Sequence, residues 1–445
     1  AVIAEQRSQS STLNTSSGGS VSEFSFFPLD YESNKHFFLA HYFKLNYNNF
    51  LRNYPYINSP VNITRIEVWI TNRSSETDDV RNLVAFQDLG ENFPEFTSID
   101  DFANDFFIGN INQNPDNSLN NLDPKNIGQN LLNDQIRNIP TLTSGFTNYG
   151  NLINEGSDYE VLENARKLDD SEYEFNTKLG YISLNQPLEN DEVVAVAFQY
   201  TINGNLYQVG EFSNEGDFSS TTSNQAVSTN NLILKMLKST ITNVQQPVWK
   251  LMMKNIYNLG TYEFSSSDFK LDIFYSNPSP LNYLQPIDES SWPQNLDKVR
   301  LLNVFDLDKL DSNGNLSNGG DGFFDVVDGV TVNKSNGLLI FPNTEPFGEF
   351  IFEKLRNSPG ENYNDISSYN DNQLKYVYNE LYSFGKTIAE KYVEKNKFNI
   401  RGKYKASDES QSISTGEYNI PSGSVIVTAG GRVLQEGVDY LVNYQ

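Results

Sequence analysis

The sequence predicts an α+β fold rich in β-strands, with antiparallel sheet modules, hairpin repeats, several peripheral helices and long Asn/Asp-rich loops. Three observations support this prediction. Short apolar runs alternate with polar residues, as strands with one buried face do. A hairpin pattern recurs along the chain. Of the 445 residues, 38% are hydrophobic and 13% aromatic, which is enough for a core, while a mean hydropathy of -0.52 leaves many residues for loops and surface.

The elements follow from local periodicity. Alternating or continuous apolar runs predict strands over residues 62–70, 173–176, 181–184, 192–200, 206–212, 269–275, 338–341, 424–429 and 432–434. Helical spacing predicts helices over residues 33–50, 130–138, 161–167, 247–259 and 371–396. Gly385 weakens the last of these by about 1 kcal/mol relative to Ala. Residues 90–150 are rich in Asn, Asp and Pro and predict long surface loops.

Two segments carry the same hairpin pattern. In each, a strand-like run ends in Asn, a Gly follows four residues later, and a second alternating run returns. The copies are Tyr173–Asn176, Gly180 and Tyr181–Leu184, and Thr331–Asn333, Gly337 and Leu338–Phe341.

A second pattern, Glu-Gly-x-Asp-Tyr, occurs at Glu155–Tyr159 and Glu436–Tyr440. The run after Tyr440 reaches Asn443 and stops at Gln445, before the Gly and return strand that the hairpin pattern requires. An incomplete hairpin leaves an unpaired strand edge. We therefore expect the chain to be an internal fragment of a larger protein.

These patterns divide the chain into five predicted parts. They are a flexible Ser/Thr/Gly linker at 1–23, a β-rich module at 24–230, a second β-rich module with an Asp/Asn/Gly loop at 231–365, a helical segment at 366–405, and a strand segment at 406–445 that continues into missing sequence.

Composition excludes several functions. A formal net charge of -25 and the absence of a basic patch exclude nucleic-acid binding. The chain contains no Cys, which excludes disulfides, thiolate metal sites and Cys nucleophiles. It has no run of about 18 uncharged apolar residues, so no membrane-spanning helix is predicted.

Catalytic patterns are weak. The two histidines, His36 and His41, are five residues apart and do not share a helix face as metal ligands would, so we expect them to be packing or surface residues. Asp268 and Asp272 could form a glycosidase pair, but chance pairs are expected in so acidic a chain. No nucleophile elbow, P-loop or dinucleotide fingerprint is present. We predict that the protein is not an enzyme.

The strongest ion-binding candidate is an Asp/Asn/Gly-rich stretch. Calcium takes six to eight oxygen ligands from flexible loops, and this stretch offers Asp306, Asp308, Asp311, Asn313, Asn315, Asp321 and Asp325. The order does not fit an EF-hand, since Gly314 is at the fourth position from Asp311 and no Glu closes the loop. An Asx-rich turn cluster is the simpler interpretation. Calcium is therefore the one cofactor for which candidate ligands exist.

Several long blocks resemble the SprA family (also called Sov), the outer-membrane gliding-motility and type IX secretion protein of Bacteroidetes. The blocks are Arg65–Asn72, Asp158–Leu168, Leu179–Asn185, Pro247–Asn255, Glu345–Gly348 and Gly423–Leu434, with the Glu-Gly-x-Asp-Tyr that follows. The resemblance runs from about residue 24 to the end. It covers only a fraction of a full-length family member.

The resemblance implies a role in transport. Family members are very large outer-membrane β-barrels that conduct folded cargo proteins to the cell surface, together with a PorV-like shuttle protein and a periplasmic plug protein. The chain has few of the alternating ten-residue strands of such a barrel. We therefore expect a soluble insertion that caps or lines the exit path, contacting the remainder of the SprA barrel, the shuttle, the plug or cargo. The extracellular side is favoured over the periplasmic side. The alternative is an independent cell-surface adhesin or glycan-binding module with calcium-stiffened loops.

Overall fold

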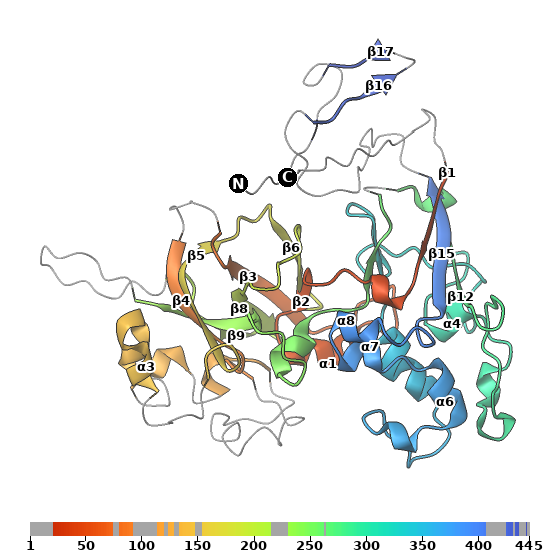
Figure 1. Ribbon diagram of the computed structural model, residues 1–445, viewed down its shortest axis with the longest axis horizontal. Coiled ribbons are helices and arrows are strands. Elements are labelled where there is room, and N and C mark those ends of the chain that lie inside the picture. Colours follow the sequence, from red (N-terminus) through yellow and green to blue (C-terminus); the bar gives the residue numbers. More distant parts are fainter. Residues whose placement is uncertain are drawn as a thin grey trace, which may run out of the picture.

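The computed structural model describes residues 21–73, 80–91, 114–119, 123–128, 133–146, 154–214, 230–261, 264–405, 424–429, 432–435 and 442. The predicted β-rich α+β fold is confirmed. Every pair of named strands in this part of the chain is antiparallel except β10 with β4. Figure 1 shows the strands β3, β4, β5, β8 and β9 gathered on one side and the helices α6, α7 and α8 on the other.

Five strands form a closed ring on the first side. They are β3 (Val61–Ile70), β8 (Val194–Ile202), β10 (Leu232–Lys238), β4 (Val80–Phe86) and β5 (Tyr159–Lys167), and each pairs with two others in that order. The pairing between β3 and β5 is the shortest in the ring, with only two residue pairs in register. A further strand, β9 (Asn205–Val209), pairs with the end of β8 after a turn at Asn203–Gly204. Every residue from Val194 to Phe198 is buried, as expected for a strand covered on both faces.

Two smaller sheets contain the predicted hairpins. The first has β2 (His36–Phe38), β7 (Tyr181–Leu184) and β6 (Tyr173–Asn176), in that order. The second has β11 (Ile256–Asn258), β14 (Leu338–Ile340) and β13 (Val332–Asn333). In each hairpin, the side-chain Oδ1 of the last Asn accepts backbone N–H bonds from the turn: Lys178 and Leu179 bond to Asn176, and Asn336 bonds to Asn333. Gly180 and Gly337 have φ of 65° and 60°, a region that favours Gly.

In both smaller sheets, the residue after the first strand donates its N–H to the carbonyl oxygen of the hairpin Gly. Leu39 N–H donates to Gly180 O at 3.0 Å, and Leu259 N–H donates to Gly337 O at 2.8 Å. The edges of the two sheets also meet. Phe37 of β2 forms a β-bridge with Met252, just before β11, and Glu32, just before β2, donates its N–H to Ile256 O of β11. The sequence repeat therefore corresponds to a structural duplication whose two copies join edge to edge.

The Glu-Gly-x-Asp-Tyr pattern forms a turn at the start of β5. Glu155 bridges Tyr159, and Gly156 N–H donates to Tyr159 O at 2.8 Å. The same turn recurs before β13, where Asp328 bridges Val332 and Gly329 N–H donates to Val332 O at 2.7 Å. The sequence pattern did not reveal this second copy, because Asp328, Thr331 and Val332 replace its Glu, Asp and Tyr, and only Gly329 is shared. Of the copy at 436–440 and the strand after it, only Val442 falls among the described residues.

A fourth sheet brings the ends of the described core together. Its order is β1 (Val21–Phe26), β15 (Phe398–Lys405) and β12 (Lys270–Tyr275). Figure 1 shows the red strand β1 beside the blue strand β15. Residues 21–23 of the predicted linker are therefore strand, while its residues 1–20 lie outside the described part. The strands β16 (Thr428–Ala429) and β17 (Arg432–Val433) pair with each other and lie within the strands predicted over 424–429 and 432–434.

Helices are short throughout the described residues. They are α1 (His41–Phe50), α3 (Leu142–Gly145), α4 (Leu301–Val304), α5 (Ile351–Lys354), α6 (Asp371–Tyr376), α7 (Glu380–Ser383) and α8 (Lys386–Ala389). Single turns of 3-10 helix occur at Pro28–Asp30, Asn117–Leu119, Pro124–Asn126, Asp134–Arg137, Ile139–Thr141, Pro247–Leu251, Ser266–Asp268, Glu289–Ser291, Gln294–Leu296 and Ile366–Ser368, and a π-helical turn at Pro346–Phe350.

The prediction of one helix over 371–396 is wrong. The chain leaves the helix after Tyr376, because Val377 is extended and Tyr378 N–H donates instead to Phe347 O at 2.8 Å. It breaks again at Phe384, where Gly385 becomes the N-cap of α8. The helix predicted over 33–50 begins only at His41, since His36–Phe38 pair with β7. Likewise, of the helix predicted over 247–259 only a 3-10 turn forms, and the segment ends in β11.

The predicted helix over 161–167 is a strand. Leu162, Ala165 and Leu168 have the three-residue spacing of a helix face, and all three are buried. A β-bulge produces the same spacing here: Asn164 has φ of 53° and the register shifts opposite it between Arg81 and Leu83. Because a bulge adds one residue to a strand, two side chains that are three positions apart in sequence can point to the same face of the sheet. Periodicity alone could not separate these cases.

Two hydrophobic clusters form the core. The first takes almost all its residues from 37–256 and contains the five-strand ring. The second combines residues 26–31 with residues 257–404 and is dominated by aromatic contacts such as Phe305 with Phe347. The change between clusters falls at Ile256 and Tyr257, adjacent residues of β11, whereas the module boundary was predicted at 230. Among the described residues, no helix is long and apolar enough to cross a membrane.

Candidate functional site

The predicted calcium ligands lie in the connection between α4 and β13. The Asp325 carboxylate accepts from Lys309 N–H at 2.6 Å, Leu310 N–H at 3.1 Å and the Tyr54 hydroxyl at 3.0 Å. Tyr54 comes from the turn after α1 and also donates to Asp306 O at 2.7 Å. Burial raises the pKa of Asp325, with backbone N–H bonds opposing that effect. Asp325 therefore joins the loop to the first cluster.

The other acids serve as turn caps in the same loop. Asp308 accepts from the N–H groups of Asp321 and Gly322, and burial raises its pKa. Asp311 accepts from Asn313 and Asn315 N–H, both at 2.9 Å, which lowers its pKa. These are the bonds of an Asx-rich turn cluster.

The remaining candidates are similarly engaged. Asp321 accepts from Phe323 N–H, and Asp306 forms ion pairs with Lys309 and Lys354, both at 3.4 Å. In the described part of the chain, no group of three or more acidic, His or Cys side chains is arranged to hold a metal ion. The calcium assignment of this loop stays a prediction.

The histidines and the possible carboxylate pair have other partners. His36 is buried, with Nε2 2.8 Å from Glu32 Oε2 and Nδ1 2.8 Å from Ser183 Oγ. Proximity to His36 and Lys35 outweighs burial and lowers the pKa of Glu32 to about 2. Asp272 forms an ion pair with Arg300 at 3.1 Å. These contacts connect elements of the fold.

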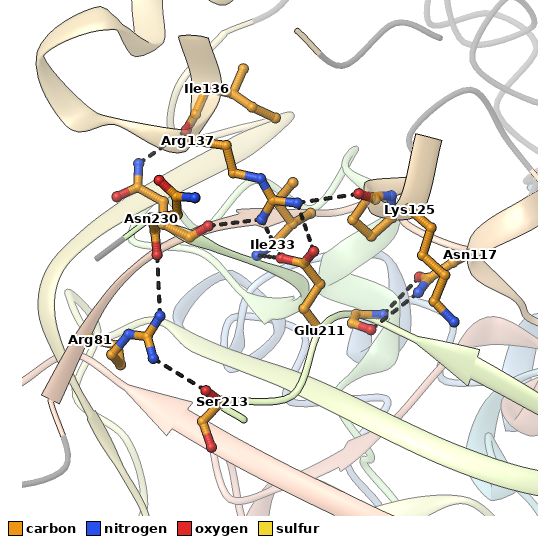
Figure 2. A network of polar contacts seen from close by, with 12 residues as sticks. Arg81, Asn117, Lys125, Ile136, Arg137, Glu211, Ser213, Asn230 and Ile233 are labelled. Atoms are coloured by element: carbon orange, nitrogen blue, oxygen red, sulfur yellow. Dashed lines mark hydrogen bonds and ion pairs between the residues drawn. The ribbon is translucent and has the colours of Figure 1, made fainter. Parts of the chain in front are cut away.

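The most extensive polar arrangement surrounds Glu211, just after β9. Arg137 donates to both carboxylate oxygens of Glu211, at 2.5 and 2.7 Å, and the pair is largely buried. Its guanidinium also donates to Asn231 O and Pro124 O. Glu211 in turn accepts from Ile233 N–H on β10 at 3.0 Å. Figure 2 shows Arg137 and Glu211 facing each other at the centre of this network.

A second arginine completes the network. Arg81 on β4 donates to Ser213 O at 3.2 Å and to Asn230 O at 3.4 Å. It therefore holds together the two points at which the chain leaves and rejoins the described fold around residues 215–229 (Figure 2). Asn117 extends the network through paired bonds with Gly210. Three separate segments, those of Asn117, Pro124 and Arg137, are tied in this way to the ends of β9 and β10.

Two further buried acids support the five-strand ring. Glu67 on β3 is paired with Arg65 at 3.0 Å and Lys167 at 3.2 Å, and it accepts from Ser213 N–H at 2.8 Å. Burial opposes its charge, but these bonds outweigh burial and lower its pKa. Glu91 is 2.6 Å from Lys235 on β10 and also accepts from the first N–H of α1, at His41. Helix α1 is thus attached to the ring through one carboxylate.

Sequence reasoning identified none of these charged groups. Arg137 and Glu211 are 74 residues apart, and Glu91 and Lys235 are 144 residues apart, so no local pattern connects them. The only available signal was a cation inside an apolar run, as at Lys235 between Leu234 and Met236. A buried lysine is rare unless it is paired.

Comparison with known families gives the decisive observation. Residues 2–200 match the family model SprA_N, described as motility related/secretion protein. Residues 2–200 of the chain belong to the SprA family. The match includes β1 to β7 and most of β8 of the described fold, and so most of the ring. A search of curated proteins finds no match.

The matched model is that of the N-terminal region of the family. The match therefore supports an N-terminal region of a motility and secretion protein, and it does not require the internal fragment expected from the hairpin repeats.

Proposed function

We propose that this chain is a non-catalytic segment of an outer-membrane protein translocon of the type IX secretion system, required for cargo secretion and gliding motility. In this proposal the segment caps or lines the exit path of the translocon. The observation that carries it is the family match over residues 2–200. The contacts of the buried acids support it further.

Those contacts are the ones a rigid scaffold needs. Glu67, Glu91 and Glu211 are each held by a cation and by a backbone N–H group. A buried carboxylate with such partners keeps a fixed position, because leaving it unpaired costs several kcal/mol. A net charge of -25 limits non-specific association. Both properties suit a surface past which folded proteins move.

The proposed partners are the remainder of the translocon barrel, a PorV-like shuttle protein, a plug protein and secreted cargo. The proposed location is the extracellular side of the outer membrane, where a segment outside the bilayer can cover the exit.

The test is an in-frame deletion of this segment from the full-length protein in its own cell. We expect cargo to accumulate inside the cell and gliding to stop. The amount of shortened protein in the outer membrane serves as the control, and restoration by the complete gene serves as the second. Normal secretion by the shortened protein at the normal level would overturn the proposal.

Location is tested separately with an epitope inserted into residues 215–229. Arg81 holds Ser213 and Asn230, the residues on either side, so the insertion should leave the ring intact. We expect antibody and protease to reach the epitope on intact cells. Protection on intact cells and exposure only after outer-membrane disruption would place the segment on the periplasmic side.

A further inference from the structure

The sheet of β1, β15 and β12 has one face in the core and one outer face. The even-numbered residues Phe398, Ile400 and Tyr404 of β15 are buried in the second hydrophobic cluster. Side chains alternate between the two faces of a strand, so the odd-numbered residues lie on the outer face. Among these, Arg401 and Lys403 are exposed. Figure 1 shows the sheet at the side of the molecule away from α3. The outer face is therefore accessible to a partner.

Basic residues follow one another along this outer face. Arg401, Lys403 and Lys405 are at alternate positions of β15. Lys397 continues the series, because its carbonyl oxygen accepts from Ser276 N–H at 2.9 Å and so extends the pairing with β12. At a rise of about 3.4 Å per residue, the four cations span about 27 Å. We call these four residues the basic stripe.

The basic stripe has a charge opposite to that of the rest of the chain. Residues 386–405 contain seven Lys and Arg and two acids, whereas the other 425 residues contain 25 and 55. Basic residues elsewhere have acidic partners, as Lys44, Arg137 and Lys354 do. Within the described part of the chain, no residue of the basic stripe forms an ion pair. The stripe is therefore a positive surface that the fold itself does not neutralise.

The nearest acid on β12 is already engaged. Asp272 lies opposite Arg401 in the sheet, but its carboxylate forms an ion pair with Arg300 at 3.1 Å. The Arg401 guanidinium lies instead over the Phe274 ring, 3.9 Å from its centre. Contact with an aromatic face leaves the charge of a guanidinium in place. Arg401 is thus held on the outer face and is still able to meet a carboxylate.

The outer face also contains a repulsion that the fold does not need. Lys270 of β12 lies directly opposite Lys403, and both are exposed. Like charges directly opposite each other destabilise a sheet. Glu23 of β1 lies opposite Lys403 on the other side, but it forms no ion pair with either lysine. A negative charge brought by a partner would relieve this repulsion.

We propose that the basic stripe binds an extended acidic segment of a partner protein, with carboxylates on alternate residues. An extended segment has the same spacing between alternate side chains as β15, so successive carboxylates can each face one cation. A small anion would meet only one or two cations of a line this long. The net charge of -25 opposes approach to an anionic membrane, to nucleic acid or to a second copy of the chain. The proposal does not depend on the secretion function.

The test follows one amide signal of the full chain during peptide titrations. Arg-Gly occurs once in the sequence, at Arg401–Gly402, so carbonyl carbon-13 in Arg and nitrogen-15 in Gly select the Gly402 signal in the middle of the stripe. The probe is a short peptide in which Glu and Thr alternate. Its controls are the same peptide with Gln for Glu, and a peptide with the same residues in one Glu block and one Thr block.

We expect a saturable shift of the Gly402 signal with the alternating Glu peptide. At about 0.01 M salt the dissociation constant should be on the order of millimolar, because exposed ion pairs are individually weak. The block peptide should bind several-fold more weakly, and the Gln peptide should give no shift. At about 1 M salt the shift should disappear, since the Debye length falls from about 30 Å to about 3 Å.

Charge-neutral variants locate the binding. Lys403→Gln and Lys405→Gln should each weaken binding about threefold, and the double variant about tenfold. Lys178→Gln removes the same charge at an exposed position in the β6–β7 turn and should change nothing. Melting temperatures no lower than that of the unchanged chain show that the variants are folded, as expected for side chains on the outer face.

Four outcomes would overturn the proposal. They are equal shifts with the Glu and Gln peptides, equal binding of the alternating and block peptides, unchanged binding by the double variant, and tighter binding of phosphatidylglycerol vesicles or a DNA duplex than of the peptide. Self-association of the chain that the double variant abolishes would also overturn it, because the occupant would then be a second copy.

Discussion

Glu67, Glu91 and Glu211 in the first half of the described fold face cationic side chains. Asp308, Asp325 and Glu361 in the second half instead accept from backbone N–H groups. Glu211 illustrates the first arrangement, with Arg137 across both oxygens. Glu361 illustrates the second: it accepts from Asn357 N–H, Gln373 Nε2 and Asn370 Nδ2, at 2.9 to 3.1 Å. The first half thus depends on charge, and the second on acceptor geometry. A hairpin whose turn ends in a Gly with positive φ occurs in both halves, as β6–β7 with Gly180 and as β13–β14 with Gly337.

The largest effect on the free energy of unfolding is expected at the glycines of these two hairpins. Gly337→Ala would place a Cβ against the backbone oxygen of Thr261 at a positive φ, and Gly180→Ala would place one against the Phe43 ring. We expect each to lower the free energy of unfolding by about 3–4 kcal/mol in urea titrations. Gly204→Ala is the matched control, since its φ is also positive but no atom lies within 4 Å, and it should cost about 1 kcal/mol. Similar losses at all three glycines would show that packing is not the cause.

Removal of one member of the Arg137–Glu211 pair comes next. Arg137→Met leaves a largely buried carboxylate without its cation and removes two bonds to carbonyl oxygens. We expect a loss of about 3 kcal/mol in chemical denaturation. Glu353→Gln breaks the more exposed pair with Arg356 and should cost about 0.5 kcal/mol or less. If both changes cost the same, the first half does not depend on buried charge.

The contrasting prediction concerns Asp325. Asp325→Ala removes the acceptor for Lys309 N–H, Leu310 N–H and the Tyr54 hydroxyl, with an expected cost of about 2 kcal/mol. Asp325→Asn retains an acceptor oxygen and should cost less than half of that. Glu211→Gln, by contrast, should cost nearly as much as Arg137→Met. Thermal melts of the four variants test the comparison directly, and an Asn variant as damaged as the Ala variant would contradict it.

Stability should also depend on pH through Asp88, in the first half. Burial raises its pKa to about 7, with Lys235 opposing this and Asp158 and Glu91 adding to it. The folded state then holds a proton that the unfolded state releases near pH 4, so stability is lost as pH rises from about 4 to 7. Asp88→Asn should remove this slope and stabilise the chain at pH 8 by about 1–2 kcal/mol, because the side chain is only partly buried. Asp297→Asn, at an exposed position, should leave the slope unchanged.

The smallest effect is expected from calcium. The carboxylates of Asp308, Asp311 and Asp325 already accept backbone N–H bonds, so a bound ion would have to displace them. A site with a dissociation constant of about 1 mM would add about 0.4 kcal/mol at 1 mM calcium. Calorimetry with calcium and with EDTA measures this. A shift several times larger, lost in Asp311→Ala, would show a strong site and favour the adhesin alternative.

Sequence reasoning predicted the fold class and the strands whose patterns are local. Apolar and polar residues alternate along β3 and β12, and along the strands of the hairpins β6–β7 and β13–β14. The turn between β8 and β9 was marked by Asn203 and Gly204. The helices were predicted less well, because long-range contacts override the local spacing of apolar residues. Tyr378 N–H donates to Phe347 O instead of continuing the helix. The bulge at Asn164 gives β5 the three-residue spacing of a helix.

The polar sites could not be predicted for a related reason. Arg81, Arg137 and Glu211 form their contacts only when β4, β9 and β10 come together in the fold. Nothing in their flanking residues distinguishes them from other charged residues. The Asp/Asn/Gly loop was conspicuous in sequence, yet turn formation and cation binding require the same residue types. Local composition therefore located the loop without deciding its use.

The most direct test of the account is cargo secretion measured against the stability of this segment. Full-length protein carrying Gly204→Ala, Asp325→Ala, Arg137→Met or Gly337→Ala would be produced at matched levels in the outer membrane. If the folded segment shapes the exit path, secretion should fall in that order, with the steepest loss near the temperature at which each variant unfolds. Normal secretion by Gly337→Ala cells in which protease shows this segment to be unfolded would contradict the account.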